Sequence, residues 1–138
     1  KVAVVYWSGT GNTEAMAQAV AEGASEKGAE TAVFTAAEFN SSMVADYDAF
    51  AFGCPAMGAE ELEDSEFEPM FAGCEAALAG KKAGIFGSYG WGDGEWLRSW
   101  ADRCKDAGIA LVNDGVMCND APDDAAKADC RALGAALV

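Results

Sequence analysis

Apolar residues along this chain follow two alternating patterns. Short, nearly continuous apolar runs are typical of strands buried on both faces, and apolar residues at every third or fourth position are typical of amphipathic helices. The continuous runs predict five strands, at residues 1–7, 30–36, 47–54, 81–88 and 109–118. The spaced pattern predicts four helices, at residues 13–27, 67–80, 95–106 and 123–137, and a short helical turn at 42–45.

The regular alternation of strands and helices predicts an α/β fold. Strands connected through helices run parallel, with right-handed crossovers, and helices then cover both faces of the sheet. We therefore predict a three-layer α/β/α arrangement around a five-stranded parallel sheet, in one domain of residues 1–138. Ligands bind beyond the carboxyl ends of the strands in such sheets, so the loops after strands one, three and four are the places to search.

The loop after the first strand carries the clearest chemistry. It offers four side-chain donors and two glycines, namely Ser8, Thr10, Asn12 and Thr13 with Gly9 and Gly11. A helix begins directly behind it, and the free N–H groups and dipole of a helix N-terminus favour an anion. The loop lacks the lysine of a triphosphate loop and the third glycine of a dinucleotide fingerprint. Neutral donors around one phosphate suit a monoester better than a pyrophosphate or a metal-bound triphosphate. Donors fill four of six positions, which favours an anion site over a plain glycine-rich turn.

Two further loops place flat or polarisable side chains at the same sheet edge. Residues 55–62 follow the third strand and residues 88–94 follow the fourth. Met57 and Trp91 stand outside any helical or strand pattern, so core packing does not explain them. A thioether and an indole can hold a planar ring between them, and the Glu60 carboxylate can accept a hydrogen bond from a ring imide N–H.

Together the three loops resemble those of flavodoxins. Residues 8–13 are similar to the phosphate loop of that family, and residues 54–58 and 86–92 resemble the two isoalloxazine loops of short-chain flavodoxins from anaerobic bacteria. The resemblance implies the strand order 2-1-3-4-5, with FMN at the switch point between strands one and three. Longer members carry an insertion of ~20 residues in the last strand, for which residues 109–118 leave no room.

The resemblance also implies roles for individual residues. The donors at positions 8, 10, 12 and 13 and the backbone of Gly9 and Gly11 hold the FMN phosphate, with Ser88 binding either the phosphate or the ribityl chain. Met57 covers the inner ring face, Trp91 the outer face, and Glu60 accepts from ring N3–H. The other predicted FMN contacts are Pro55, Ala56, Gly58, Ala59, Tyr89, Gly90 and Gly92, with Asn119 touching either the ribityl chain or the Trp91 loop.

The implied function is a low-potential one-electron carrier that holds FMN non-covalently and cycles mainly between the neutral semiquinone and the hydroquinone. The Gly58 carbonyl is implied to accept a hydrogen bond from the reduced ring, and Ala59 stands where several relatives have an acidic residue, which changes the bias of this turn.

A flavin-dependent NAD(P)H:quinone reductase on the same fold is the alternative, although it needs an open ring face. The chain lacks the residues of a receiver domain or a tyrosine phosphatase.

Charge narrows the possible partners of this chain, and cysteine content narrows its possible metal sites and its compartment. Nine basic and 23 acidic residues give a net charge of −14, which excludes nucleic-acid binding. Such a charge is typical either of a protein that docks on a basic patch or of a surface that only keeps the protein soluble. The resemblance implies ferredoxin-linked oxidoreductases, docked near the acidic residues Glu60, Glu61, Glu63, Asp64 and Glu66, and a solvated loop is the alternative interpretation of this acidic run. Five scattered cysteines and no histidine argue against a zinc or iron–sulfur site and favour free thiols in a cytoplasmic protein. We expect a monomer with no membrane span and no signal peptide.

Overall fold

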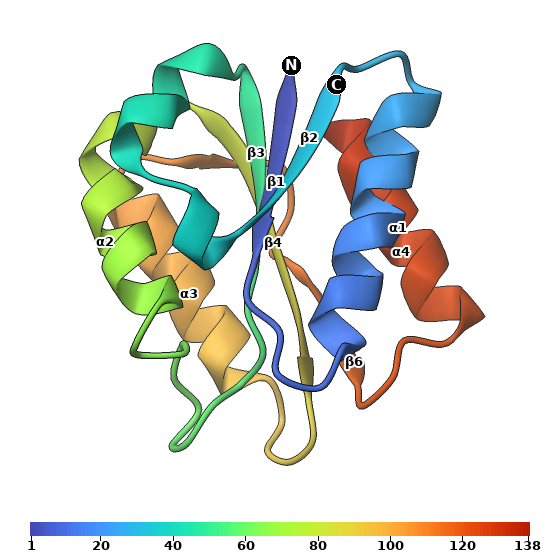
Figure 1. The fold of residues 1–138 in the computed structure, drawn as a ribbon. Helices are drawn as coiled ribbons and strands as arrows, with labels where there is room; N and C mark the ends of the chain where they lie inside the picture. The colour runs from blue at the N-terminus through green and yellow to red at the C-terminus, as the bar shows by residue number, and fades with distance from the viewer.

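Six strand segments form one parallel sheet in the computed structural model, which describes residues 1–138 throughout (Figure 1). They are β1 (Val2–Tyr6), β2 (Thr31–Thr35), β3 (Ala49–Gly53), β4 (Lys82–Tyr89), β5 (Ala110–Leu111) and β6 (Val116–Asn119). The order is β2-β1-β3-β4-β5, with β6 also paired to β4, and all neighbours are parallel. This confirms the predicted order.

Helices cover both faces of this sheet. They are α1 (Asn12–Glu26), α2 (Phe67–Leu78), α3 (Glu95–Asp106) and α4 (Asp124–Ala136), with 3-10 turns η1 (Ala36–Glu38) and η2 (Ser41–Asp46). Helices α1 and α4 lie on one face and α2 and α3 on the other (Figure 1). The helix ends fall within two residues of the predicted ones, and only the short η1 was not predicted. No helix is both long and apolar enough to cross a membrane.

The fifth strand position differs from the prediction. We predicted one strand over residues 109–118, and that prediction is wrong, because residues 112–115 separate β5 from β6. The Asn113 side chain accepts a hydrogen bond from the Gly115 N–H at 2.8 Å, and Gly115 has a φ of +112°. An asparagine turn followed by a left-handed glycine breaks the ladder, and this turn signal was already present in the sequence.

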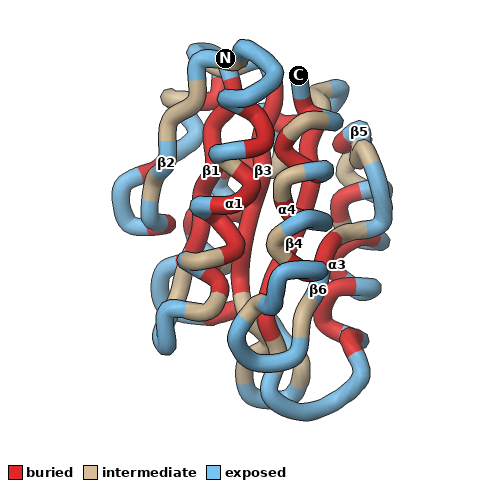
Figure 2. Tube along the Cα trace, turned by 90° about the vertical axis from the view of Figure 1, so that its right-hand side faces the viewer, coloured by how far each residue is buried: buried red, intermediate tan, exposed pale blue.

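The two faces of the sheet have different cores. Large aromatic side chains fill the α2 and α3 side, whereas alanine and valine make up most of the core on the α1 and α4 side. A Cβ added at Gly23 would lie 2.0 Å from the Arg131 carbonyl oxygen, and one at Gly134 would lie 2.0 Å from the Val20 carbonyl oxygen. Helices α1 and α4 are therefore in backbone contact. Figure 2 shows the central strands and the inner helix faces buried, whereas the edge strand β2 is partly exposed.

The sheet order brings three loops to one edge. The chain leaves the carboxyl ends of β1, β3 and β4 at the bottom of Figure 1 and enters α1, α2 and α3 there. The crossover direction reverses between β1 and β3, because β2 lies on one side of β1 and β3 on the other. Ligand sites of open α/β sheets lie at such a switch point.

Candidate functional site

A cavity of about 370 Å³ opens at this switch point. Its walls come from the loops after four strand segments: Trp7, Gly9, Thr10 and Asn12 after β1; Pro55, Ala56 and Met57 after β3; Ser88, Tyr89 and Gly90 at the end of β4; and Asp120 after β6. A second cavity, of about 440 Å³, lies against the same β1 loop. Two acidic residues, Glu14 and Glu66, line that second cavity and only one, Asp120, lines the first, so an anion is better placed in the first.

The backbone of residues 8–14 presents a set of unpaired donors. The N–H groups of Ser8, Gly9 and Thr10 donate to no protein group, and neither do those of Thr13 and Glu14 in the first turn of α1. The turn is closed by a 3.1 Å hydrogen bond from the Gly11 N–H to the Ser8 hydroxyl. Unpaired N–H groups at the N-terminus of a 15-residue helix suit a phosphate group, and no cation is needed.

Thr13 and Ser88 form the buried floor beneath this loop. The Ser88 N–H donates to the Thr13 hydroxyl oxygen at 3.4 Å, which leaves the Thr13 hydroxyl proton for another acceptor. The Ser88 hydroxyl donates to the Asp120 carbonyl oxygen at 2.6 Å. Thr13 is thus placed to donate to an anion, whereas Ser88 uses its own proton to connect β4 to the loop after β6.

A tight hairpin forms the opposite wall. Met57 and Glu61 exchange two backbone hydrogen bonds of 2.9 Å, and the turn between them contains Gly58 with a φ of +49° and Glu60 with a φ of +55°. A Glu60 carboxylate oxygen accepts from the Glu95 N–H at 3.1 Å, at the start of α3. This bond connects the hairpin after β3 to the loop after β4. Ala59 is exposed on the outside of the turn.

Comparison with known proteins identifies the family. The flavodoxin family model matches residues 4–134. The chain is 46% identical to the flavodoxin of Megasphaera elsdenii, over 98% of this chain and 96% of that protein, and 41% identical to the flavodoxin of Clostridium beijerinckii, over 95% and 94%. The chain belongs to the flavodoxin family. A solution structure of the two-electron reduced Megasphaera elsdenii flavodoxin superposes with a TM-score of 0.89, at 45% identity and over 99% and 98% of the two chains.

Family membership agrees with the position of the cavity, because flavodoxins bind FMN at the β1/β3 switch point. Nine predicted residues, drawn from all three loops, line this cavity, namely Gly9, Thr10, Asn12, Pro55, Ala56, Met57, Ser88, Tyr89 and Gly90. The other nine do not line it, namely Ser8, Gly11, Thr13, Gly58, Ala59, Glu60, Trp91, Gly92 and Asn119, and of these Ser8 and Gly11 line the second cavity instead. Trp91 is 58% exposed on the loop after β4, and the Glu60 carboxylate caps α3. The Asn119 side-chain amide donates to the Tyr89 carbonyl oxygen at 3.3 Å and so contacts the base of the Trp91 loop.

Sequence reasoning missed two residues that line the cavity. Trp7 is the last residue before the phosphate loop, and its ring packs so close to Gly9 that an added Cβ would lie 3.1 Å away. Its position at the carboxyl end of a buried strand was the available signal. Asp120 has a φ of +56° and supplies the carbonyl oxygen that binds Ser88. No pattern in the sequence distinguishes Asp120 from an ordinary turn residue.

Glu63 corrects one prediction about the acidic loop. We predicted that Glu63 faces a partner, but its side chain is buried and caps α2 by accepting from the N–H groups of Ser65, Glu66 and Phe67, each at 2.8 Å, and from the Ser65 hydroxyl. Burial alone would raise the pKa of Glu63, but these hydrogen bonds outweigh it and lower the pKa to about 2. A carboxylate held this way stabilises a helix N-terminus, so its burial follows from local structure.

The same glutamate also anchors the hairpin loop. The Glu63 N–H donates to the Cys54 sulfur at 3.3 Å, and the buried Trp96 indole N–H donates to the Cys54 carbonyl oxygen at 3.0 Å. Both ends of the segment between Cys54 and Glu63 are therefore fixed. Burial raises the pKa of the Cys54 thiol to about 12, so this sulfur stays protonated at neutral pH.

Replacing Glu63 with glutamine is expected to destabilise the protein by about 2 kcal/mol at pH 7, the upper range for loss of a helix cap. The folded pKa lies below the ordinary value of 4.5, so the carboxylate stabilises the fold above that pH and loses this effect as the pH falls towards 2. The difference between wild type and E63Q should shrink over that range in urea unfolding. E61Q, at an exposed neighbour, controls for loss of one charge, and a gap that stays constant with pH would contradict the cap.

Proposed function

We propose that this protein is an electron carrier that binds FMN non-covalently and passes on one electron at a time. The observation that carries the proposal is the row of unpaired N–H groups at residues 8–14, at the sheet position where the family binds FMN. When bound, FMN supplies the redox chemistry, and the protein sets its potentials. The phosphate loop, the hairpin and the loop after β4 would hold the phosphate, the ribityl chain and the ring.

We further propose that the protein works at low potential, mainly between the neutral semiquinone and the hydroquinone. Residues 8–13, 55–62 and 88–94 contain no lysine or arginine, and the chain carries a net charge of −14. Two unit charges ~10 Å apart repel by about 1.7 kcal/mol at an effective dielectric constant of ~20. Several such contributions oppose the extra negative charge of the last reduction step and lower the potential of that couple.

Gly58 is expected to control the first reduction step. Its carbonyl would accept a hydrogen bond from the reduced ring when the turn reorients, and glycine makes both orientations accessible because positive φ costs it little. The turn already has a φ of +49° at Gly58, and an added Cβ would meet nothing within 4 Å, so alanine changes conformational preference without a clash.

We therefore expect G58A to lower the semiquinone yield. One hydrogen bond is worth about 1 kcal/mol, which corresponds to roughly a fivefold change in the one-electron equilibrium. The yield is measured by absorbance during anaerobic reductive titration, with G73A, a glycine-to-alanine change in α2 outside the cavity, as the control. A yield equal to that of wild type in G58A would exclude the turn as the source of semiquinone stabilisation.

The first test of the whole proposal is a visible spectrum during stepwise anaerobic reduction. We expect a yellow protein that turns blue, from the neutral semiquinone, before it bleaches. Direct bleaching without a radical would support the alternative of a two-electron NAD(P)H:quinone reductase on the same fold. A colourless protein that added FMN does not restore would refute FMN binding itself.

We also propose that the carrier acts as a monomer in the cytoplasm and docks briefly on redox partners with basic patches, such as ferredoxin-linked oxidoreductases. The free thiols of all five cysteines fit a reducing compartment. Glu61, Asp64 and Glu66 are exposed beside the hairpin and offer a negative surface. Attraction between such surfaces is screened by salt within about 8 Å at physiological ionic strength.

If docking is electrostatic, the second-order rate of electron transfer to a basic partner should fall steeply as salt is added. Stopped-flow measurements between roughly 0.01 and 0.5 M salt test this, because the Debye length shrinks from ~30 Å to only a few ångströms. A small uncharged reductant serves as the control, since its rate should change little. Rates with the basic partner that are equally flat would contradict electrostatic docking.

A further inference from the structure

Helices α2 and α3 each follow one of the two predicted ring loops. The hairpin at residues 57–61 leads into α2, and the loop at residues 90–94 leads into α3. Both helices lie on the same face of the sheet, with their N-termini at the edge where the cavity opens (Figure 1). The separation of these two helices therefore influences the separation of the two loops.

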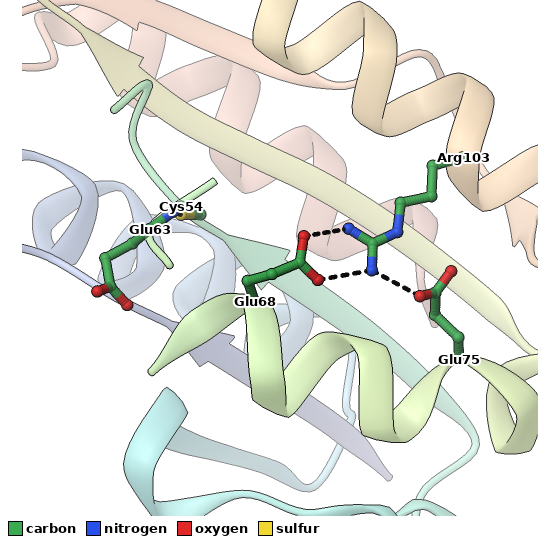
Figure 3. Close-up of polar contacts among 5 residues, drawn as sticks. All are labelled: Cys54, Glu63, Glu68, Glu75 and Arg103. Carbon is green, nitrogen blue, oxygen red and sulfur yellow. Dashed lines mark hydrogen bonds and ion pairs between the residues drawn. The ribbon is translucent and has the colours of Figure 1, made fainter. Parts of the chain in front are cut away.

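A group of three charged residues joins these helices. The Arg103 guanidinium of α3 donates two 2.7 Å hydrogen bonds to the Glu68 carboxylate and one of 2.6 Å to Glu75, both on α2 (Figure 3). We call Arg103, Glu68 and Glu75 the Arg103 clamp. The three side chains are only 24 to 40% exposed, and the guanidinium also lies 5.0 Å from the centre of the Phe71 ring. A planar guanidinium held in this way by two carboxylates fixes the direction of these hydrogen bonds as well as their length.

The clamp borders a cavity that lies behind the hairpin. This cavity, of about 190 Å³, is lined by Glu60 and Glu61 of the hairpin, by Trp96 and Trp100 of α3, and by Glu68 and Arg103 of the clamp. Close-packed side chains hold neighbouring elements in place, and a void provides no such contacts. On this side the hairpin is held through the Glu60 bond to α3 and through its ends, one of which is bonded to β4 by the Ala56 N–H and the other of which leads into α2. Part of its position therefore depends on where α2 and α3 lie.

We propose that Arg103 is a positioning residue for the flavin ring. By holding α2 against α3, the clamp sets the distance between the hairpin and the loop after β4, without touching the ligand itself. The inference rests on the proposed function, because it concerns the same FMN site. The inference concerns only the two ring loops of that site and not the phosphate loop, which lies at the start of α1 on the opposite face of the sheet.

The experiment compares three ligands in R103M, using fluorescence for FMN and riboflavin and displacement of FMN for inorganic phosphate. We expect FMN and riboflavin each to bind about tenfold more weakly, because the ring loops are common to both, and phosphate to bind as in wild type. R103K keeps the charge but not the planar guanidinium, and its affinity for FMN and riboflavin should fall roughly threefold. Semiquinone yield should fall in the same order.

The Arg131 variant R131M is the matched control. Arg131 pairs with Glu22 at 3.5 Å between α4 and α1, on the other face, so R131M removes an arginine ion pair without altering the ring loops. It should leave riboflavin affinity unchanged. E75Q removes only one clamp carboxylate and provides a milder variant, with a loss of roughly threefold, if R103M does not fold.

Three outcomes would overturn the inference. Riboflavin binding at wild-type strength in R103M, or in E75Q if R103M is unfolded, would show that the clamp does not position the ring. An equal loss of riboflavin and phosphate affinity would show general loosening. Failure of the wild-type protein to bind FMN would refute the proposed function and the inference together, and the wild-type measurement alone reveals that case.

Discussion

The variant T10D is expected to lose more than a hundredfold in FMN affinity while it keeps its affinity for riboflavin. Thr10 is exposed at the tip of the phosphate loop and lines the cavity. Two unit charges about 5 Å apart repel by about 3 kcal/mol at an effective dielectric constant of ~20, and every 1.4 kcal/mol is a factor of ten. Riboflavin lacks the phosphate, so the new carboxylate has no charge to repel.

The variant T10N is the control for T10D, because asparagine has the shape of aspartate but no charge. It is neutral and still offers a donor, so its FMN affinity should stay within about tenfold of that of wild type. Fluorescence titration of apoprotein with FMN and with riboflavin measures both affinities. If T10D weakens riboflavin as much as FMN, or leaves both unchanged, the phosphate does not lie in the loop at residues 8–13.

The variant G134A is expected to destabilise the fold by about 3 kcal/mol, which lowers the melting temperature by roughly 10 °C for a domain of this size. An added Cβ would lie 2.0 Å from the Val20 carbonyl oxygen and 2.8 Å from the Ala24 nitrogen. Both atoms belong to the backbone of α1, so no side-chain rotation relieves the clash. The two helices must move apart, and the small residues between them lose contact.

Gly73 in α2 provides the opposite case. A Cβ added there meets nothing within 4 Å, so G73A should stabilise the helix by about 0.5 to 1 kcal/mol through its better helix propensity. Thermal and denaturant unfolding of the two variants gives both values. Equal effects of G134A and G73A would mean that α1 and α4 are not in backbone contact.

The strands and helices were predictable because their apolar patterns repeat along the chain. Each central strand repeats apolar residues over most of its length, and each helix repeats an apolar face, so local pattern alone locates them. The order of strands does not follow from that pattern and came from the resemblance of the loops. The break between β5 and β6 lies in a strand at the sheet edge, where turn residues override apolar pattern at little cost.

The candidate site was predictable to a similar degree. Loop residues such as Thr10 and Met57 were recognisable because they break the apolar pattern at strand ends. Glu63 was misassigned because a buried acid and a surface acid look alike in a sequence, and only the three N–H groups of the next helical turn distinguish them. Arg103 was missed because its partners lie on another helix, a relation that no spacing along one chain reveals.

The backbone contact between α1 and α4 also constrains the order of events during synthesis. The phosphate loop is the first part of the site to be translated, yet the helix that carries it packs against α4, which is translated after every other element described here. Until α4 leaves the ribosome, one side of α1 is uncovered and its apolar residues face water. The first loop of the cavity to be made therefore gains its full support only when α4, the last helix described here, has packed against α1.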